Sequence, residues 1–299
     1  MLDVLTWADD MYPIVLKRFQ DRLENRTDLI KSTIGYVPLK SSNQYADVGM
    51  GGYGLMSKYN GTTIPEQNQK RGFKKTYTPE EWVGKATVTY KDAKIDQSGE
   101  AAKAGRKMAD SCAQTQIRQF YNLFANGFNA SYAGADAVAL FSSAHPINSE
   151  TGADTFSNTG TSTFSVAAIT STETTMNRYK TFDGLDFDCN ADLVLISPEL
   201  EPKAKEFFGK EARLIPEVNE NGANPVYGMK YVVIKGFTAK QWALADSNLL
   251  KEYAKMVEIT APMVIPNKPD NPLIQEYIAY CDFTLGWSDA RMIYGHNPA

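Results

Sequence analysis

One continuous helical pattern, over residues 98–126, limits the shapes that this chain can take. It opens on Ser98, a residue type that caps helices, and Gly127 can end it. Its apolar residues recur at helical spacing on one face: Ala113, Ile117, Phe120, Tyr121 and Phe124. A helix of roughly 28 residues is about 42 Å long, which exceeds the span of a small domain. The pattern therefore predicts a spine on which other elements pack.

The segment before this helix has too few large apolar residues to form a core of its own. Residues 45–95 contain the run DVGMGGYGLMSKYNGTTIPEQNQKRGFKKTY, which is rich in glycine, tyrosine and lysine. The following KATVTYK, residues 85–91, alternates apolar and polar residues and predicts a half-buried strand. Because an isolated arm is difficult to order, we expect a long hairpin that projects from a domain and lies on a neighbouring molecule.

This expected hairpin has a basic side, although the chain as a whole carries a net charge of −4. Two interpretations stay open: a solvated run of charge, or a contact with an acidic surface on a neighbouring subunit. The candidate residues for contacts between subunits are four basic and two aromatic side chains: Lys70, Arg71, Lys74, Lys75, Tyr53 and Tyr59.

The remaining elements alternate between helices and strands without a regular βαβ repeat, which favours an α+β fold. An amphipathic helix is expected over residues 13–31, with Pro13 at its first position, and a short helix over 166–180 should turn Ile169 and Met176 inward.

Residues after 190 are expected to form most of the strands. The apolar run LVLI, residues 193–196, predicts a covered strand, and Ser197 can cap the helix that follows it. YVVIKGF and WALADSN predict two further strands. The chain then closes with KMVEITAPMVI and with a long β segment that we expect to break at Gly286.

Composition excludes several classes of protein. The cysteines Cys112, Cys189 and Cys281 form no CxxC pair, so buried free thiols are expected and no metal site. The glycine-rich GMGGYG lacks the strand and helix that flank a nucleotide-binding loop, so no cofactor is expected. The acidic charge gives no drive to bind nucleic acid tightly. The absence of a signal peptide and of an apolar run near 20 residues favours a cytoplasmic protein without a membrane span.

One of only two histidines, His145, stands beside Ser142 and Ser143. A small serine hydrolase would use His145 as its base, oriented by Asp136 or Asp154. These spacings give no preorganised pair of nucleophile and base, and the chain has no G-x-S-x-G motif. The favoured interpretation is a turn residue, because the following proline keeps His145 out of the helical region. The hydrolase is kept as the second alternative.

Three stretches resemble the major capsid proteins of tailed bacteriophages, which have the Hong-Kong-97-type coat fold. DLVLISPELEPKAKEFF, residues 192–208, looks like the family's apolar strand followed by a proline, a leucine and a helix. NPVYGMKYVVIKGF and the later WALADSN resemble its next two strands, and LFSSAHP, residues 140–146, resembles a loop after the spine helix. Among subfamilies, the chain looks most similar to the Mu-like major head subunit group.

The resemblance implies a phage major capsid fold of class α+β with four regions. These are an N-terminal arm over residues 1–44, an extended projecting loop over 45–92, a peripheral domain with a long spine helix over 93–165 and 250–299, and an axial domain over 166–249.

The resemblance also implies a structural protein without catalysis. As a homo-oligomer it would form pentamers and hexamers that close an icosahedral shell around double-stranded DNA. The partners implied are a separate scaffolding protein, a portal and decoration proteins, with no membrane. Its place would be the virion capsid, assembled in the cytoplasm of the host bacterium. An encapsulin-like nanocompartment shell with the same fold is the first alternative.

Overall fold

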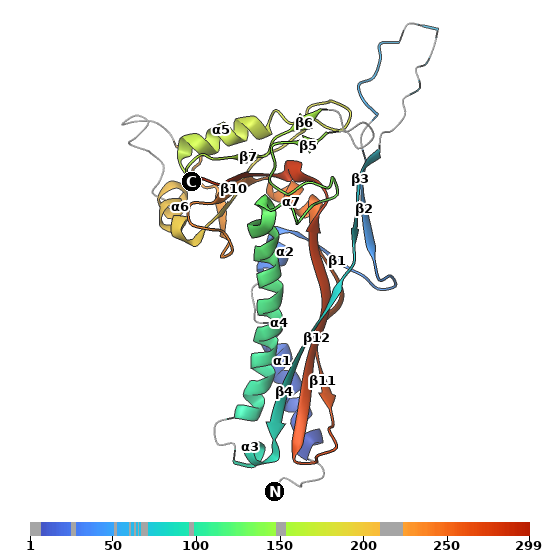
Figure 1. Ribbon diagram of the computed structural model, residues 1–299, viewed down its shortest axis with the longest axis vertical. Coiled ribbons are helices and arrows are strands. Elements are labelled where there is room, and N and C mark those ends of the chain that lie inside the picture. Colours follow the sequence, from blue (N-terminus) through green and yellow to red (C-terminus); the bar gives the residue numbers. More distant parts are fainter. Residues whose placement is uncertain are drawn as a thin grey trace.

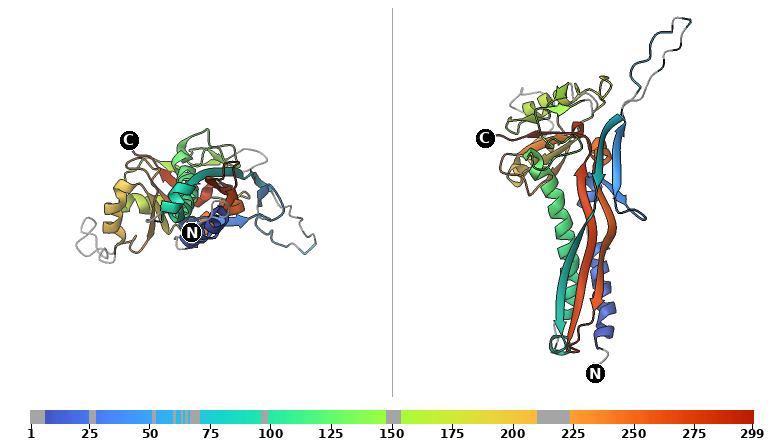
Figure 2. Two further views of the ribbon diagram at one scale, coloured as in Figure 1. Left: turned by 90° about the horizontal axis from the view of Figure 1, so that it is seen from below. Right: turned by 45° about the vertical axis from the view of Figure 1, so that its right-hand side comes forward.

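The computed structural model describes residues 7–24, 28–50, 53–59, 61–62, 64, 66, 71–95, 99–147, 154–209 and 224–299. These residues form three parts (Figure 1). We call the long part the shaft and the broader part at one end of it the head. The protruding strands and the segment that joins them, residues 45–77, are the projecting hairpin, and residues 51–70 are its tip. The right-hand view of Figure 2 shows the hairpin continuing past the head, away from the shaft.

The shaft combines two long helices with a four-stranded sheet. The spine helix α4, Glu100–Ala125, has 26 residues, and α1, Trp7–Glu24, packs along it. The sheet has the order β1-β11-β12-β4, in which only β1 and β11 are parallel. Its strands are β1 Gly35–Pro38, β11 Ala254–Asn267, β12 Ile274–Trp287 and β4 Glu80–Thr89, and the short helices α2 Leu29–Thr33 and α3 Tyr90–Ile95 lie between them in the chain.

The apolar stripe predicted for the spine helix is confirmed. Phe120 and Phe124 are fully buried, Ala113 is buried, and Ile117 and Tyr121 are partly buried against the same core. The helix begins after Gly99, which has a left-handed backbone, and ends at Asn126. Ser98, the expected cap, lies outside the described residues. At about 1.5 Å per residue, α4 is about 39 Å long, close to the length expected.

The head is built on a five-stranded sheet of order β7-β13-β10-β8-β9. Side chains alternate between the two faces of a strand, so β8 contributes to two cores. Val194 and Ile196 pack into the head, whereas Leu193 and Leu195 join the core shared with the spine helix. The elements of the head are β7 Thr159–Gly160, α5 Val166–Met176, β8 Leu193–Ile196, α6 Glu201–Phe208, β9 Lys230–Val233, β10 Trp242–Ala245, α7 Ser247–Tyr253 and β13 Ile293–His296.

Short elements complete the chain. The two-residue strands β5 His145–Pro146 and β6 Thr155–Phe156 pair with each other. Three short 3-10 turns, η1 Asn126–Phe128, η2 Pro198–Leu200 and η3 Ala290–Met292, follow or precede longer elements. Ile169 and Met176 on α5 are fully buried, as predicted, although the helix ends at Met176 and not at residue 180.

The projecting hairpin consists of β2 Tyr45–Met50 and β3 Arg71–Tyr77, paired antiparallel. The expectation that residues 45–95 form one projecting hairpin is wrong for their second half. β4 pairs with β12 over its whole length, from Glu80 opposite Phe283 to Thr89 opposite Ile274. The few apolar residues of β4 suffice there because Val88 is buried in the shaft core.

The first helix also differs from its expectation. Pro13 lies inside α1 and not at its first position, because the helix begins six residues earlier, at Trp7. At Trp7, where the described part of the chain begins, the buried indole Nε1 donates a hydrogen bond of 3.0 Å to the carbonyl of Pro272. The segment expected to be an arm thus packs on the spine helix of its own subunit.

Two further expectations were wrong. β12 continues through Gly286, which pairs with Lys255, and ends after Trp287. A side chain at Gly286 would place its Cβ 2.8 Å from the ring of Tyr77, so the glycine permits the hairpin base to approach the strand. Ser197 stands at the start of η2, but its hydroxyl makes no hydrogen bond to the helix. The boundaries of the four expected regions stay predictions.

We predict that Gly105→Ala destabilises the subunit, because a Cβ at Gly105 would lie 2.4 Å from the backbone oxygen of Val15 and push α1 off the spine helix. The expected loss is about 1–3 kcal/mol in the free energy of unfolding, measured by urea denaturation. Gly84→Ala is the control, since its Cβ would meet nothing within 4 Å. Equal stabilities of the two variants would contradict this account of the helix pair.

Candidate assembly site

The base of the projecting hairpin is fixed to the shaft by a partly buried ion pair. Lys255 Nζ on β11 lies 2.6 Å from Asp47 Oδ2 on β2, with side chains only 14% and 18% exposed. The same ammonium group stands 5.4 Å from the centre of the Tyr45 ring. Ion pairs sheltered from water are screened less by salt than exposed ones, so this contact can set the direction of the hairpin.

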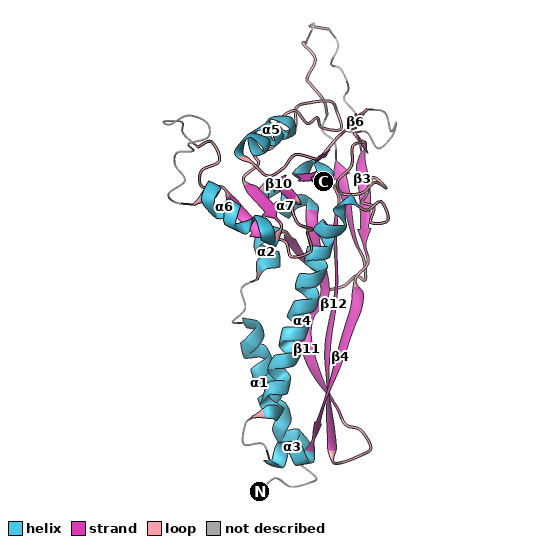
Figure 3. Ribbon diagram, turned by 60° about the vertical axis from the view of Figure 1, so that its left-hand side comes forward, coloured by secondary structure: helices cyan, strands magenta, loops and turns pink. Residues whose placement is uncertain are grey.

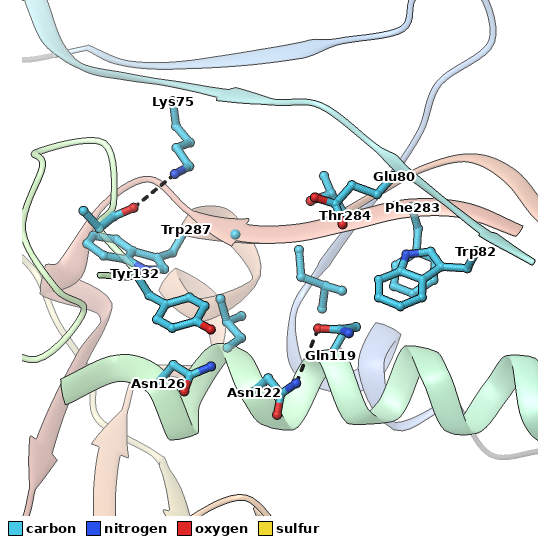
Figure 4. A pocket seen from close by; sticks show the side chains of 14 residues that line it. Lys75, Glu80, Trp82, Gln119, Asn122, Asn126, Tyr132, Phe283, Thr284 and Trp287 are labelled. Atoms are coloured by element: carbon cyan, nitrogen blue, oxygen red, sulfur yellow. Dashed lines mark hydrogen bonds between the residues drawn. The ribbon is translucent and has the colours of Figure 1, made fainter. Parts of the chain in front are cut away.

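A second attachment comes from β3. Lys75 Nζ donates a hydrogen bond of 3.3 Å to the carbonyl of Ala133, in the loop after the spine helix (Figure 4). Burial lowers the pKa of Lys75, and the nearby Asp136 partly opposes this effect. Tyr77 is buried against Gly286, and burial raises the pKa of its hydroxyl far above the usual range. The hairpin is therefore held at its base by side chains from both of its strands.

A cavity of about 340 Å³ separates the hairpin base from the spine helix. Trp82 stacks on Phe283 at one end, with ring centres 5.8 Å apart, and Tyr132 stands at the other end, as Figure 4 shows. The Trp82 indole nitrogen is buried and has no hydrogen-bond partner among the described residues. The walls also carry the amides of Gln119 and Asn122. Four separate segments meet here, so no local pattern in the sequence could have revealed this cavity.

The described part of the hairpin tip exposes large apolar side chains to solvent. Met56 is 92% exposed and Leu55 is 78% exposed, and Tyr53, Tyr59 and Ile64 are also exposed. Contiguous apolar groups of this size on a projecting segment are typical of a surface that another molecule covers.

The six candidate contact residues fall into different environments. Tyr53 and Tyr59 are exposed at the tip, and Lys74 is exposed on β3. Lys75 contacts the loop of its own subunit. Lys70 lies outside the described residues, as does the side chain of Arg71, whose backbone pairs with Met50.

His145 is buried and is not a simple turn residue. Its Nδ1 lies 2.6 Å from Asp136 Oδ2, and its Nε2 lies 3.1 Å from Asn158 Oδ1 and 3.2 Å from the carbonyl of Leu140. Both ring nitrogens thus lie against Asp136, Asn158 and Leu140. In the part of the chain that is described, no hydrogen bond joins the ring to Ser142 or Ser143.

Asn158 connects this histidine to the rest of the head. No sequence pattern had indicated Asn158 as an important residue. Its side-chain nitrogen donates to the carbonyls of Leu140, Ala290 and Ile293, at 2.7, 3.2 and 3.2 Å. One asparagine thus ties the loop after the spine helix to the last strand. A single asparagine in a polar loop carries no sequence signal for this role.

The second histidine, His296, is buried between β7 and β10. Its ring stacks on Trp242 with centres 4.2 Å apart. Nδ1 accepts a hydrogen bond of 3.2 Å from the backbone N–H of Ser162, and Nε2 lies 2.8 Å from Thr172 Oγ1. Burial lowers the pKa of His296 to about 4. Protonation of His296 Nδ1 would also break this hydrogen bond, because the new hydrogen would point at the N–H of Ser162.

The three cysteines are buried and free, as expected. Within the described residues, no set of three or more histidine, cysteine or acidic side chains is arranged to hold a metal ion. A search of the same residues finds no helix with the length and hydropathy needed to cross a membrane.

We expect His145→Ala to lower the free energy of unfolding by about 3–5 kcal/mol, because it removes the ring that lies 2.6 Å from the buried Asp136 carboxylate and 3.1 Å from Asn158 Oδ1. Urea denaturation would measure this, with Ser143→Ala at the exposed neighbour as a control of unchanged stability. Covalent labelling by a fluorophosphonate should be absent from all three proteins. Labelling of the wild type that Ser143→Ala or His145→Ala abolishes would contradict this assignment.

His296 should make the subunit less stable in acid. The unfolded chain takes up the proton near pH 6.5 and the folded chain only near pH 4, so stability is lost as the pH falls between these values. The expected contribution is roughly 3 kcal/mol, and it disappears in His296→Phe, which keeps an aromatic ring on Trp242. Denaturation at several pH values compares the two profiles. Identical slopes would refute the role of His296.

Comparison with solved structures shows what the fold resembles. The capsid of the cyanophage P-SCSP1u is 10% identical, with a TM-score of 0.56 over 92% of this chain and 89% of that one. The capsid of the native GTA particle is 10% identical, with a TM-score of 0.56 over 92% of both chains. A virus-like particle from Pyrococcus furiosus is 9% identical, with a TM-score of 0.51 over 96% of this chain and 100% of that one.

These likenesses confirm the expected α+β coat fold of the Hong-Kong-97 type. No curated protein sequence matches the chain significantly. A family model described as phage capsid protein matches residues 73–295, which extends from β3 of the hairpin to β13 of the head. This family is structural, so the serine hydrolase alternative is wrong. The chain belongs to the phage capsid protein family and is a structural major capsid protein, not an enzyme.

Proposed function

We propose that copies of this chain assemble through their projecting hairpins into pentamers and hexamers, which close an icosahedral shell around double-stranded DNA. The observation that carries this proposal is the hairpin tip, where Leu55 is 78% exposed and Met56 is 92% exposed. A second copy is the natural cover for them. Each such contact joins two different surfaces, and repeated contacts of this type close into a ring.

The attachments at the hairpin base support the same proposal. Lys255 with Asp47 and Lys75 with the Ala133 carbonyl fix the direction in which the tip leaves the subunit. A fixed direction gives every contact the same angle, which ring closure requires. Each contact is small, and the stability of a shell then comes from many of them acting together.

We assign the contacts between subunits to Tyr53, Tyr59 and Lys74, and we extend the assignment to Lys70 and Arg71 from the sequence. Lys75 serves in this scheme by holding its own hairpin. The expected division into an N-terminal arm, a projecting loop, a peripheral domain and an axial domain belongs to the same proposal, as does the similarity to the Mu-like group.

The partners follow from this function. A net charge of −4 suits a wall that encloses DNA without binding it tightly. A separate scaffolding protein would guide assembly, which takes place in the cytoplasm of the host bacterium, and a portal and decoration proteins would complete the virion. An encapsulin-like compartment with a related fold is the second candidate. Particles purified from phage-producing cells should contain DNA, whereas a compartment would contain a cargo protein.

Removing the hairpin tip should abolish closed shells without unfolding the subunit. In this variant an Asn-Gly turn replaces residues 51–70 and keeps β2 and β3 paired. We expect the circular-dichroism spectrum and the melting temperature to match those of the wild type, because the described tip residues contribute nothing to the cores. Negative-stain microscopy should show particles for the wild type and none for the variant.

The opposite outcomes are informative. Closed particles from the tip-deleted chain would contradict the proposed role of the hairpin in assembly. A variant that unfolds or aggregates would show that the tip belongs to the core of the subunit, which also contradicts the proposal.

A further inference from the structure

Two of the three buried cysteines meet where the spine helix lies along the shaft sheet. α4 runs beside the long strands (Figure 3), and Cys112 of this helix is 7% exposed. Cys281 belongs to β12 and is 1% exposed. The two thiols are in hydrogen-bond contact with each other. The fold thus pairs two cysteines that stand far apart in the sequence.

The surrounding packing places these side chains on facing surfaces. Successive side chains of a strand alternate between its faces, so Ala279, Cys281 and Phe283 share one face of β12, and all three are buried. Cys112 belongs to the same core as Ala279. One turn further along α4, Gln116 donates a hydrogen bond of 3.1 Å to the β11 carboxylate that stands opposite Phe283. Cys112 therefore lies between the levels of Ala279 and Phe283, which is the level of Cys281.

The contact gives the two thiols different acidities. The hydrogen bond lowers the pKa of Cys112, although burial opposes this effect. The same bond, together with burial, raises the pKa of Cys281. Cys112 is therefore the first of the two to form a thiolate, which is the nucleophilic form of cysteine, while Cys281 keeps its proton.

The third cysteine has a different environment. Cys189 is buried in the core of the head, which is separate from the cores that contain Cys112 and Cys281. Burial raises the pKa of Cys189 to about 12, with a further contribution from Asp246. This side chain supplies an internal control, because it is a buried thiol in another core.

We propose that Cys112 and Cys281 form the site of an internal disulfide, which closes when a peroxide reaches the folded subunit and which links the spine helix to β12. The Cys112 thiolate attacks one oxygen of the peroxide, breaks the O–O bond and becomes a sulfenic acid. The Cys281 sulfur then attacks this sulfur, an S–S bond forms, and the hydroxyl group leaves as water. In total, two thiols lose two electrons and two protons, and one hydrogen peroxide is reduced to two molecules of water.

The cross-link acts on the contact between the helix and the sheet that supports the whole subunit. It closes a loop of about 170 residues that includes most of the head, and closing a long loop stabilises a protein mainly by restricting its unfolded chain. Reducing agents in a cytoplasm keep such thiols free, whereas a particle outside the cell meets oxidants. The inference goes beyond the proposed function, since it concerns one subunit and does not depend on how copies join.

Counting free thiols tests the site. The purified protein is reduced, freed of reductant, treated with hydrogen peroxide while folded, and then unfolded and alkylated for mass spectrometry. We expect three alkylated cysteines before treatment and only Cys189 after it. Peptide mapping should show a cross-link between Cys112 and Cys281 that dithiothreitol removes. The oxidised protein should melt about 5–10 °C above the reduced one.

Alanine variants identify the sulfur atoms. Cys112→Ala and Cys281→Ala should each lose the cross-link and the shift in melting temperature. Cys189→Ala is the matched control and should keep both. In Cys281→Ala the oxidised Cys112 has no partner, so dimedone should label it as a sulfenic acid, whereas the wild type should not accumulate this label.

The measurements on the wild type do not depend on the variants folding. Three free thiols in the folded protein after peroxide treatment would overturn the inference. A cross-link that includes Cys189, or one that joins two copies of the chain on a non-reducing gel, would also overturn it. The same holds for a melting temperature that does not rise when the cross-link forms. These results would leave the proposed assembly of the shell untouched.

Discussion

The packing of the spine helix against β12 and the head sheet is the contact on which the rest of the molecule depends. Phe120 and Phe124 of α4 enter the same core as Phe283 of β12 and Leu195 of β8. Burial of apolar side chains is the main driving force for folding, so this shared core stabilises both parts at once. Because one core includes residues of both parts, the head and the shaft move together. A hairpin attached to the shaft therefore has a defined direction relative to the whole subunit.

Polar groups in the interior reinforce this arrangement at the points where loops cross. Asn158 and His145 connect the loop after the spine helix to η3 and β13, and His296 connects β13 to α5. Each buried donor or acceptor of these groups is costly to leave without a partner. Both histidines of the chain thus have structural roles. Because burial lowers the pKa of His296, the stability of the head falls as the solution becomes acidic.

The sequence predicted those elements whose residues carry a local pattern. The stripe through Phe120 and Phe124 and the apolar run of β8 produced correct elements because burial imposes a period on each. β4 was misplaced because its partner β12 lies far away along the chain, and a half-buried strand looks the same in a hairpin and in a sheet. Pro13 suggested the start of a helix and Gly286 a break in a strand, but α1 already includes Trp7 and β12 continues through Gly286. The position of Glu81 on β4 directly opposite Asp282 on β12 depends on strand register, which the sequence does not specify.

The central claim is that the projecting hairpin, whose base is fixed to its own subunit, joins each copy to the next through its exposed tip. Electron cryomicroscopy of particles assembled from the purified chain tests this most directly. The account predicts density in which residues 45–77 of each subunit extend from their own shaft and contact the adjacent subunit. Density in which the hairpin folds back on its own shaft, or joins no neighbour in a closed particle, would contradict it.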